Sequence, residues 1–112
     1  MELNERLDFI EFRQELLFNN TEVDRILFEY NITRDQYNEI MDLMEEYRRA
    51  IRADEDSISH GEFEQRIYDI VDHIRGNYHF CEYLTRAFKK ERRWEEVFDK
   101  LYGDMPKYKG IE

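Results

Sequence analysis

The sequence predicts an all-α protein, a compact array of about five or six helices. Its 112 residues contain four glycines and a single proline, Pro106, so the first 105 residues carry no obligate helix breaker. All-β domains use glycine and proline in their many turns, and this scarcity therefore favours long helices. Apolar side chains also recur every three or four positions, the period that places them on one face of a helix.

The size and composition suit a single domain. Hydrophobic residues make up 41% of the chain and aromatic residues 15%. They can fill one modest core, because aromatic rings bury large areas. We expect one helical domain over residues 1–103 and a C-terminal tail over residues 104–112.

The first expected helix runs from about residue 3 to residue 18 and has an unusually wide apolar surface. One stripe has a 4-3-7 spacing and consists of Leu3, Leu7, Ile10 and Leu17. Three further side chains widen it: Phe9, Phe12 and Leu16. A stripe this wide is difficult to bury against one neighbour. We therefore expect contact with the protein body on one side and an oligomer interface on the other, formed by Leu3, Leu7, Phe9, Ile10 and Phe12.

Capping residues predict where the following helices begin. Thr21 can cap a short second helix, and Thr33 with Gln36 matches the capping box of a third helix that runs to about Ala53. Another capping box, at residues 59–62, predicts a fourth helix. Gly76 is well placed to end it, because glycine adopts positive φ without steric cost.

The last helical stretch, residues 78–102, contains two apolar sets that are separated by Glu91-Arg92-Arg93. This separation is compatible with a tight turn between two short helices or with one bent helix. We favour two helices, the second ending at Gly103.

The formal net charge of −10 is unevenly distributed. Residues 1–64 hold 18 acidic and 7 basic side chains, whereas residues 65–112 hold 9 acidic and 10 basic ones. The acidic part should repel nucleic acid and anionic membranes. It can attract a basic protein partner, or it can simply form a well-solvated surface.

Cysteine use and hydropathy indicate a cytoplasmic protein. Cys81 is the only cysteine, so an intramolecular disulfide is impossible, which fits a reducing compartment. No apolar stretch approaches the roughly 20 residues of a membrane span. The first residues lack the basic and apolar regions of a secretory signal, so we expect no membrane association.

Two residue pairs were considered for catalysis or metal binding. His79 and Cys81 are two positions apart and diverge on a helix, and a cysteine in this setting is more often a small core residue than a nucleophile. Asp69 and His73 are four positions apart and can touch on one helical face. Such a pair is more often a surface ion pair than two metal ligands.

The acidic segment that begins at Asp54 does not match a calcium loop. Position 58 would need an oxygen ligand and position 59 a glycine, but the chain has Ile58 and Ser59. Four scattered glycines form no phosphate-binding loop. We expect no enzymatic activity, no catalytic residue, no metal site and no cofactor.

One basic cluster is present and consists of Arg86, Lys89, Lys90, Arg92 and Arg93. With Tyr83 and Trp94 nearby it has the composition of a nucleic-acid site. Positive side chains also complement the C-terminal end of a helix, and they can pair with acids of the N-terminal half or of a neighbouring subunit. We regard nucleic-acid binding as the less favoured of these interpretations.

Five segments follow one another along the chain: ERLDFIE at residues 5–11, DRILF at 24–28, ITRDQ at 32–36, HGEF at 60–63 and RWEEVF at 93–98. In this order they resemble the YhaI-like family, a domain of unknown function found in small all-α proteins of Bacillus and relatives. The resemblance covers roughly residues 5–103. It implies a multihelical fold with self-association and brings no catalytic residue. Family members often have glycine in the turn where this chain has Glu91-Arg92.

Two functional hypotheses follow from these features. The first is a non-enzymatic protein that acts through protein–protein interaction and self-associates as a homo-oligomer, because the first helix is too widely apolar for one neighbour. The second is an acidic inhibitor or antitoxin-like protein that covers a basic surface of a nucleic-acid enzyme or regulator.

Overall fold

The computed structural model describes residues 2–54, 58–105 and 107 of the chain. Six α-helices and one short 3₁₀ turn succeed one another: α1 (Leu3–Asn19), α2 (Glu22–Glu29), α3 (Arg34–Arg52), α4 (His60–Ile70), η1 (Asp72–Ile74), α5 (Tyr78–Lys90) and α6 (Glu95–Leu101). No strand occurs in these ranges. The prediction of an all-α array of about five or six helices is confirmed.

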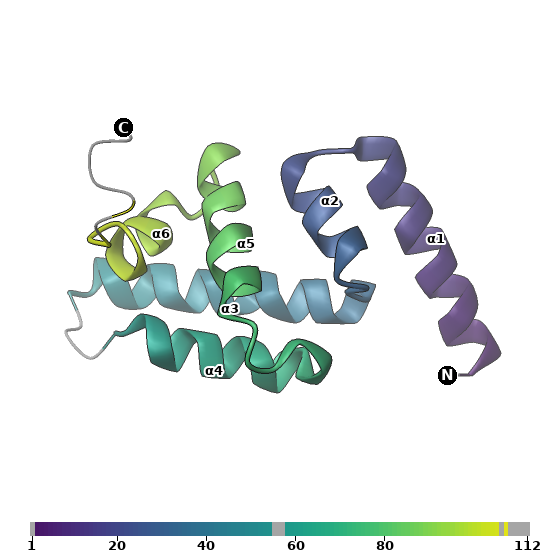
Figure 1. Ribbon diagram of the computed structural model, residues 1–112, viewed down its shortest axis with the longest axis horizontal. Coiled ribbons are helices and arrows are strands. Elements are labelled where there is room, and N and C mark those ends of the chain that lie inside the picture. Colours follow the sequence, from purple (N-terminus) through teal and green to yellow (C-terminus); the bar gives the residue numbers. More distant parts are fainter. Residues whose placement is uncertain (1, 55–57, 106, 108–112) are drawn as a thin grey trace.

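The longest helix, α3, is the element along which the others are arranged (Figure 1). Helix α4 packs alongside α3, α5 crosses in front of it, and α6 contacts both α3 and α5. Helices α1 and α2 form a hairpin at one end, where α2 contacts α5 and α1 contacts α3. The molecule is elongated, measuring 44 × 26 × 24 Å, and α1 lies at one tip.

Side-chain caps fix the starts of three helices where the sequence predicts them. The Thr33 hydroxyl accepts the Gln36 N–H at 3.1 Å, and the Gln36 side chain accepts the Thr33 N–H at 3.0 Å. Thr21 and Asp24 form the same reciprocal pair at the start of α2. Of the two bonds predicted at Ser59, the described residues show the one that its hydroxyl accepts. These bonds satisfy N–H groups that the first helical turn leaves free.

The fourth helix ends earlier than predicted, at Ile70 instead of Gly76. The helix is followed by Val71, which is fully buried, and then by η1. The chain turns at Gly76, which has a φ of +89°. Arg75 reaches back and donates to the Tyr68 carbonyl oxygen at 3.1 Å. This bond satisfies a carbonyl of the last turn of α4, so the helix can end without glycine.

Residues 78–102 form two separate helices, α5 and α6, and not one bent helix. The turn between them places Arg92 and Trp94 at φ of 63° and 49°, a left-handed region that favours glycine. Arg93 stabilises this turn, since its guanidinium lies 4.7 Å from the Phe88 ring centroid and donates to the Tyr37 hydroxyl at 3.2 Å. The favoured interpretation is confirmed, and contacts with Phe88 and Tyr37 compensate for the missing glycine.

Two glycines give a matched test of this fold. A methyl group added at Gly61, near the start of α4, meets no atom within 4 Å, whereas one added at Gly103 lies 2.5 Å from the Asp99 backbone oxygen. We expect Gly61→Ala to stabilise the protein by about 0.5–1 kcal/mol, as alanine does in a helix. We expect Gly103→Ala to destabilise it by about 1–3 kcal/mol through overpacking.

Urea unfolding of both variants at one protein concentration measures these free energies. A Gly103→Ala variant as stable as the unaltered protein would contradict the close approach of the chain to α6.

Candidate functional site

Helix α1 has an inner face that is attached to the body. Phe12 and Leu16 are 5% and 3% exposed, and the Phe12 ring packs 6.2 Å from that of Tyr37 on α3. Arg34 at the start of α3 pairs with Asp8 at 3.1 Å and with Glu15 at 2.7 Å. These contacts fix how α1 is rotated about its own axis.

A second anchor connects α1 to α2. The Arg13 guanidinium lies 3.7 Å from the Phe28 ring centroid and donates to the Phe28 carbonyl oxygen at 3.1 Å. It also donates to the Asn31 side chain at 2.9 Å. The flank of α1 that carries Arg13 therefore faces α2.

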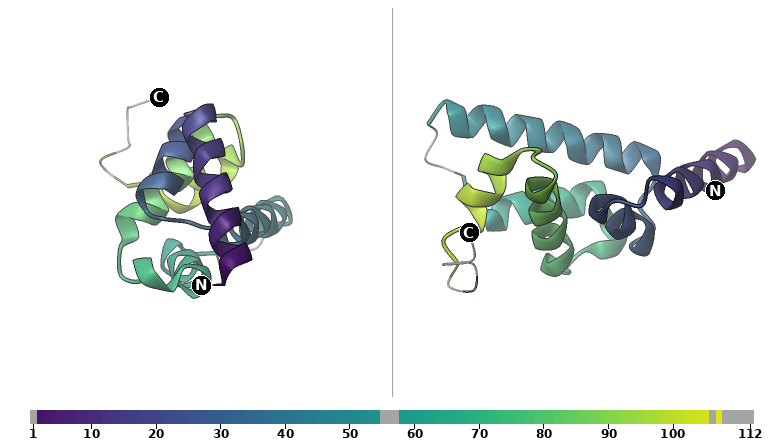
Figure 2. Two further views of the ribbon diagram at one scale, coloured as in Figure 1. Left: turned by 90° about the vertical axis from the view of Figure 1, so that its right-hand side faces the viewer. Right: turned by 90° about the horizontal axis from the view of Figure 1, so that it is seen from above.

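The opposite face of α1 remains in solvent (Figure 2). We call its five exposed apolar side chains the outer stripe: Leu3 (70% exposed), Leu7 (50%), Ile10 (52%), Leu17 (59%) and Phe18 (90%). They include every member of the stripe with the 4-3-7 spacing. No other helix of the described chain exposes as many large apolar side chains.

The structure divides the five predicted interface residues between the two faces. Leu3, Leu7 and Ile10 belong to the outer stripe, whereas Phe9 is half-buried. Phe12 lies in the core and is not available to a second subunit, because Tyr37 and Arg34 cover its ring. Phe18 is not among the predicted interface residues, yet it is the most exposed side chain of the outer stripe. Its position next to Leu17 was the available signal.

A shallow groove of about 720 Å³ runs beside the outer stripe. Its apolar lining comes from Phe12, Leu16 and Phe18 of α1 and from Tyr37 of α3. Acidic side chains from α1 and α2 also line it: Glu11, Glu15 and Asp24. The apolar surface of α1 is therefore flanked by negative charge on this side.

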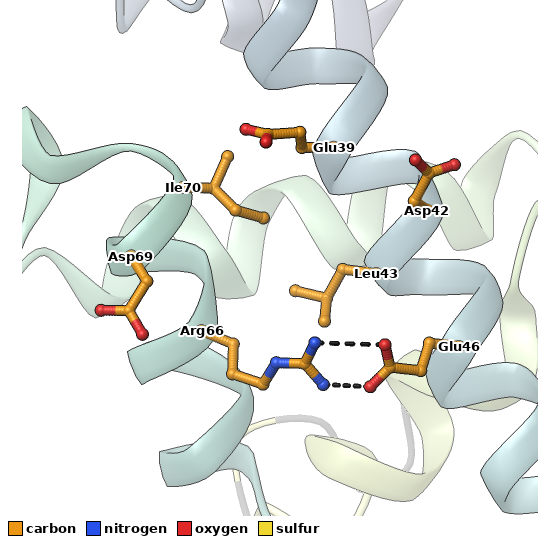
Figure 3. A pocket seen from close by; sticks show the side chains of 7 residues that line it. All are labelled: Glu39, Asp42, Leu43, Glu46, Arg66, Asp69 and Ile70. Atoms are coloured by element: carbon orange, nitrogen blue, oxygen red, sulfur yellow. Dashed lines mark hydrogen bonds and ion pairs between the residues drawn. The ribbon is translucent and has the colours of Figure 1, made fainter.

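A second hollow, of about 420 Å³, lies between α3 and α4, and we call it the acidic groove (Figure 3). Four carboxylates line it: Glu39, Asp42, Glu46 and Asp69. Arg66 forms a two-pronged ion pair with Glu46, whose hydrogen bonds lower the pKa of this carboxyl. Glu39 and Asp42 are exposed, and neither has an ion pair within the described ranges. The groove therefore keeps a negative character.

Basic residues of the cluster form ion pairs with different acidic residues of the same chain. Lys89 bonds to Asp99 at 2.6 Å, Lys90 to Glu22 at 3.4 Å, and Arg93 to Glu91 at 3.2 Å. Arg86 is half-buried, and Arg92 is exposed in the turn. Lys89, Lys90 and Arg93 thus already have carboxylate partners, one of which, Glu22, lies in the acidic N-terminal half. This arrangement resembles a set of structural ion pairs more than a continuous phosphate-binding surface.

Cys81 lies in a buried polar cluster together with Tyr68, Glu64 and Tyr102. Burial raises the pKa of the Cys81 thiol from 9 to about 12, so at neutral pH it is protonated and a poor nucleophile. Tyr102 is 1% exposed and donates to Glu64 at 2.7 Å, and burial raises the pKa of its hydroxyl. Glu82, also 1% exposed, pairs with Lys107 at 2.8 Å. All these buried groups have partners, as structural groups do.

The residue pairs considered for metal binding are separated. His79 is exposed between the rings of Tyr78 and Tyr83, while Cys81 points into the core. Asp69 pairs with Arg75, and His73 instead bonds to the Tyr30 carbonyl oxygen. Over residues 2–54, 58–105 and 107, no three His, Cys, Asp or Glu side chains are grouped to hold a metal ion. The acidic segment weighed for calcium lies mostly outside the described residues.

Within the same ranges, no helix combines the length and the apolar composition that crossing a bilayer requires. In the C-terminal tail, Met105 packs against the core, and Lys107 pairs with Glu82.

The burial of Cys81 can be measured by thiol modification. At pH 8, we expect iodoacetamide to modify Cys81 in the folded protein at least about a thousandfold more slowly than in the unfolded chain, because the raised pKa removes the reactive thiolate. Glu29→Cys, which adds an exposed thiol on α2, is the control and should react at the rate of an unfolded chain. Equal rates for Cys81 and the introduced thiol would contradict the burial.

Comparison with known proteins adds no relative to this description. No protein-family model, curated protein sequence or solved structure matches the chain. The resemblance to the YhaI-like family therefore stays a prediction.

Proposed function

We propose that this protein acts through protein–protein interaction, without enzymatic activity, and that it self-associates through the outer stripe of α1. The observation that carries this proposal is the exposure of Leu3, Leu7, Ile10, Leu17 and Phe18 on one helix face. Contiguous apolar surface of this kind typically marks an interaction site. Symmetric pairing of identical patches is the commonest way for a soluble protein to cover it.

The free energy involved supports a reversible association. Full burial of one leucine, isoleucine or phenylalanine side chain contributes about 1.5–3 kcal/mol. Each side chain of the outer stripe is still at least half exposed, so pairing two copies recovers roughly 10 kcal/mol in total. Loss of translational and rotational freedom costs about 4–15 kcal/mol. We therefore expect a concentration-dependent oligomer.

A lipid surface is a less suitable partner for the same face. Helix α1 carries four acidic side chains, Glu5, Asp8, Glu11 and Glu15, against Arg6 and Arg13. Amphipathic helices that bind anionic membranes are typically rich in lysine and arginine on their polar face. The charge of α1 therefore favours a protein partner.

We make two further proposals, on the cellular location of the protein and on its family. We propose a cytoplasmic protein, supported by its single, buried cysteine. We also propose membership of the YhaI-like family, supported by the capping role of Thr33 and Gln36 within the ITRDQ segment.

Sedimentation measures the self-association. We expect the unaltered protein to form oligomers across roughly 1–100 μM, and we expect Leu7→Glu to shift it to the monomer because a charge then lies in the apolar contact. Tyr83→Glu is the matched control: Tyr83 is 45% exposed, close to the 50% of Leu7, but lies on α5. A strictly monomeric unaltered protein would sink the proposal.

A second candidate function rests on the acidic groove. Glu39 and Asp42 are free of ion pairs within the described residues and stand beside Asp69 and Glu46. Such a surface suits an inhibitor or antitoxin-like protein that covers a basic region of a nucleic-acid enzyme or regulator. Opposite potentials would accelerate the encounter and make binding sensitive to salt.

Pull-down from host lysate at low and high salt tests this candidate. We expect a basic protein to be retained at low salt, released at high salt, and lost with Glu39→Gln/Asp42→Asn. Glu29→Gln/Glu95→Gln removes the same charge from exposed sites on α2 and α6 and should retain the partner. Equal loss in both double variants indicates that net charge alone drives the retention, which contradicts a specific groove.

A further inference from the structure

We propose that two copies of this chain pair through α1 as a parallel two-stranded coiled coil, with the acidic flank of each outer stripe against the basic flank of the other. The inference rests on the proposed self-association and specifies its partner, orientation and register. It is carried by the spacing of the stripe, the charges on its flanks and the position of one polar residue.

The spacing along α1 is that of a coiled-coil seam. Leu3, Leu7, Ile10, Gln14 and Leu17 follow each other at intervals of 4, 3, 4 and 3 residues, and all five are exposed. Two helices whose apolar residues alternate in this way can interlock along a common seam. The inner face, with Phe12 and Leu16, lies on the other side of the helix and remains available to the body.

The two flanks of this seam carry opposite charges. One flank holds Glu11 and Phe18, next to the groove that Glu15 and Asp24 also line. The other flank holds Arg6 and Arg13. Arg6 and Glu11 are exposed, and neither has an ion-pair partner among the described residues.

These flanks select the parallel orientation. In a parallel pair, the flank with Arg6 on one helix faces the flank with Glu11 on the other, so Arg6 meets Glu11 of the second copy five positions further on. In an antiparallel pair, each flank faces its own kind, so Arg6 and Glu11 of the two copies do not meet and their attraction is lost.

Gln14 points to the same orientation. It is the only polar residue at a seam position, and a polar residue there typically sets register and oligomer state at some cost in stability. In a parallel, in-register pair, the two Gln14 amides lie opposite each other and can exchange hydrogen bonds. In either antiparallel register that keeps the seam aligned, Gln14 would face Leu3 or Ile10, and its amide would lose a partner.

The position of α1 leaves room for this pairing. The helix lies at the tip of the molecule (Figure 1), where α3 contacts its inner side and α2 the flank with Arg13, while the outer stripe stays exposed. Two copies joined along the outer stripe would therefore carry their bodies on opposite sides of the paired helices.

Disulfide cross-linking tests the orientation. The native thiol of Cys81 is buried, so Gln14→Cys supplies the one accessible thiol. In the parallel pair its two Cα atoms lie within the roughly 4.4–6.8 Å that a disulfide spans. We expect mild oxidation to give a covalent dimer, and we expect Glu29→Cys, exposed on α2, to give none.

A mixture of mass-tagged Leu3→Cys and untagged Gln14→Cys chains should yield no mixed disulfide, because eleven helical residues, about 16 Å, separate the two positions in the parallel pair. A mixed disulfide between the two kinds of chain, or the absence of a Gln14→Cys dimer, overturns the parallel pairing.

Charge reversal provides an independent readout. We expect Arg6→Glu alone and Glu11→Arg alone each to weaken the dimer about three- to tenfold, since each places like charges at two symmetric contacts. The double variant Arg6→Glu/Glu11→Arg should restore the original dissociation constant in sedimentation. Failure of the double variant to recover affinity counts against the proposal.

The outcomes separate this geometry from the underlying association. If the unaltered protein is monomeric, the proposed function fails together with the pairing. If it is a dimer that Leu7→Glu dissociates, but Gln14→Cys does not cross-link, only the parallel geometry fails. A trimer or tetramer of the unaltered protein likewise overturns the two-stranded pair and leaves self-association standing.

Discussion

Helix α1 is held to the rest of the molecule along one side only, and this constraint determines which apolar surface remains in water. Two ion pairs from Arg34, to Asp8 and to Glu15, hold the same side of α1 against the start of α3. With the rotation of α1 fixed in this way, Phe12 enters the core and Leu7 cannot. Among the described residues, no other element covers the opposite face, since only α2 and α3 contact α1 extensively.

Helix boundaries that depend on local chemistry could be predicted from the sequence. Thr33 and Gln36 satisfy each other within one turn at the start of α3, and Thr21 accepts the Asp24 N–H at the start of α2. The end of α4 could not be predicted in this way. It depends on Arg75 folding back to the Tyr68 carbonyl and on the complete burial of Val71, and both require the tertiary structure.

In the outer stripe, too, the sequence predicted what depends on local spacing but not what depends on tertiary contacts. The 4-3-7 spacing identified four of the five side chains of the outer stripe, because spacing reports which side chains share a face; Phe18 lies outside that spacing. It could not show which of two adjoining apolar faces meets the body, since that choice depends on Arg34, which lies outside α1. The closeness of basic residues in the sequence likewise does not make one continuous basic surface. Lys90 and Arg93 lie three positions apart, but Lys90 pairs with Glu22 and Arg93 stacks on Phe88.

The two candidate surfaces differ in what they cost the isolated protein. Carboxylates such as Glu39 and Asp42 are well hydrated, so the acidic groove can remain open to water without a partner. The outer stripe has no such compensation, because apolar side chains in water lose the free energy that burial would provide. Since the groove is lined by α3 and α4 and the stripe by α1, the two surfaces share no residue. In our proposals, association of the stripe is therefore driven by its own exposed apolar surface, whereas occupation of the groove would require a basic partner.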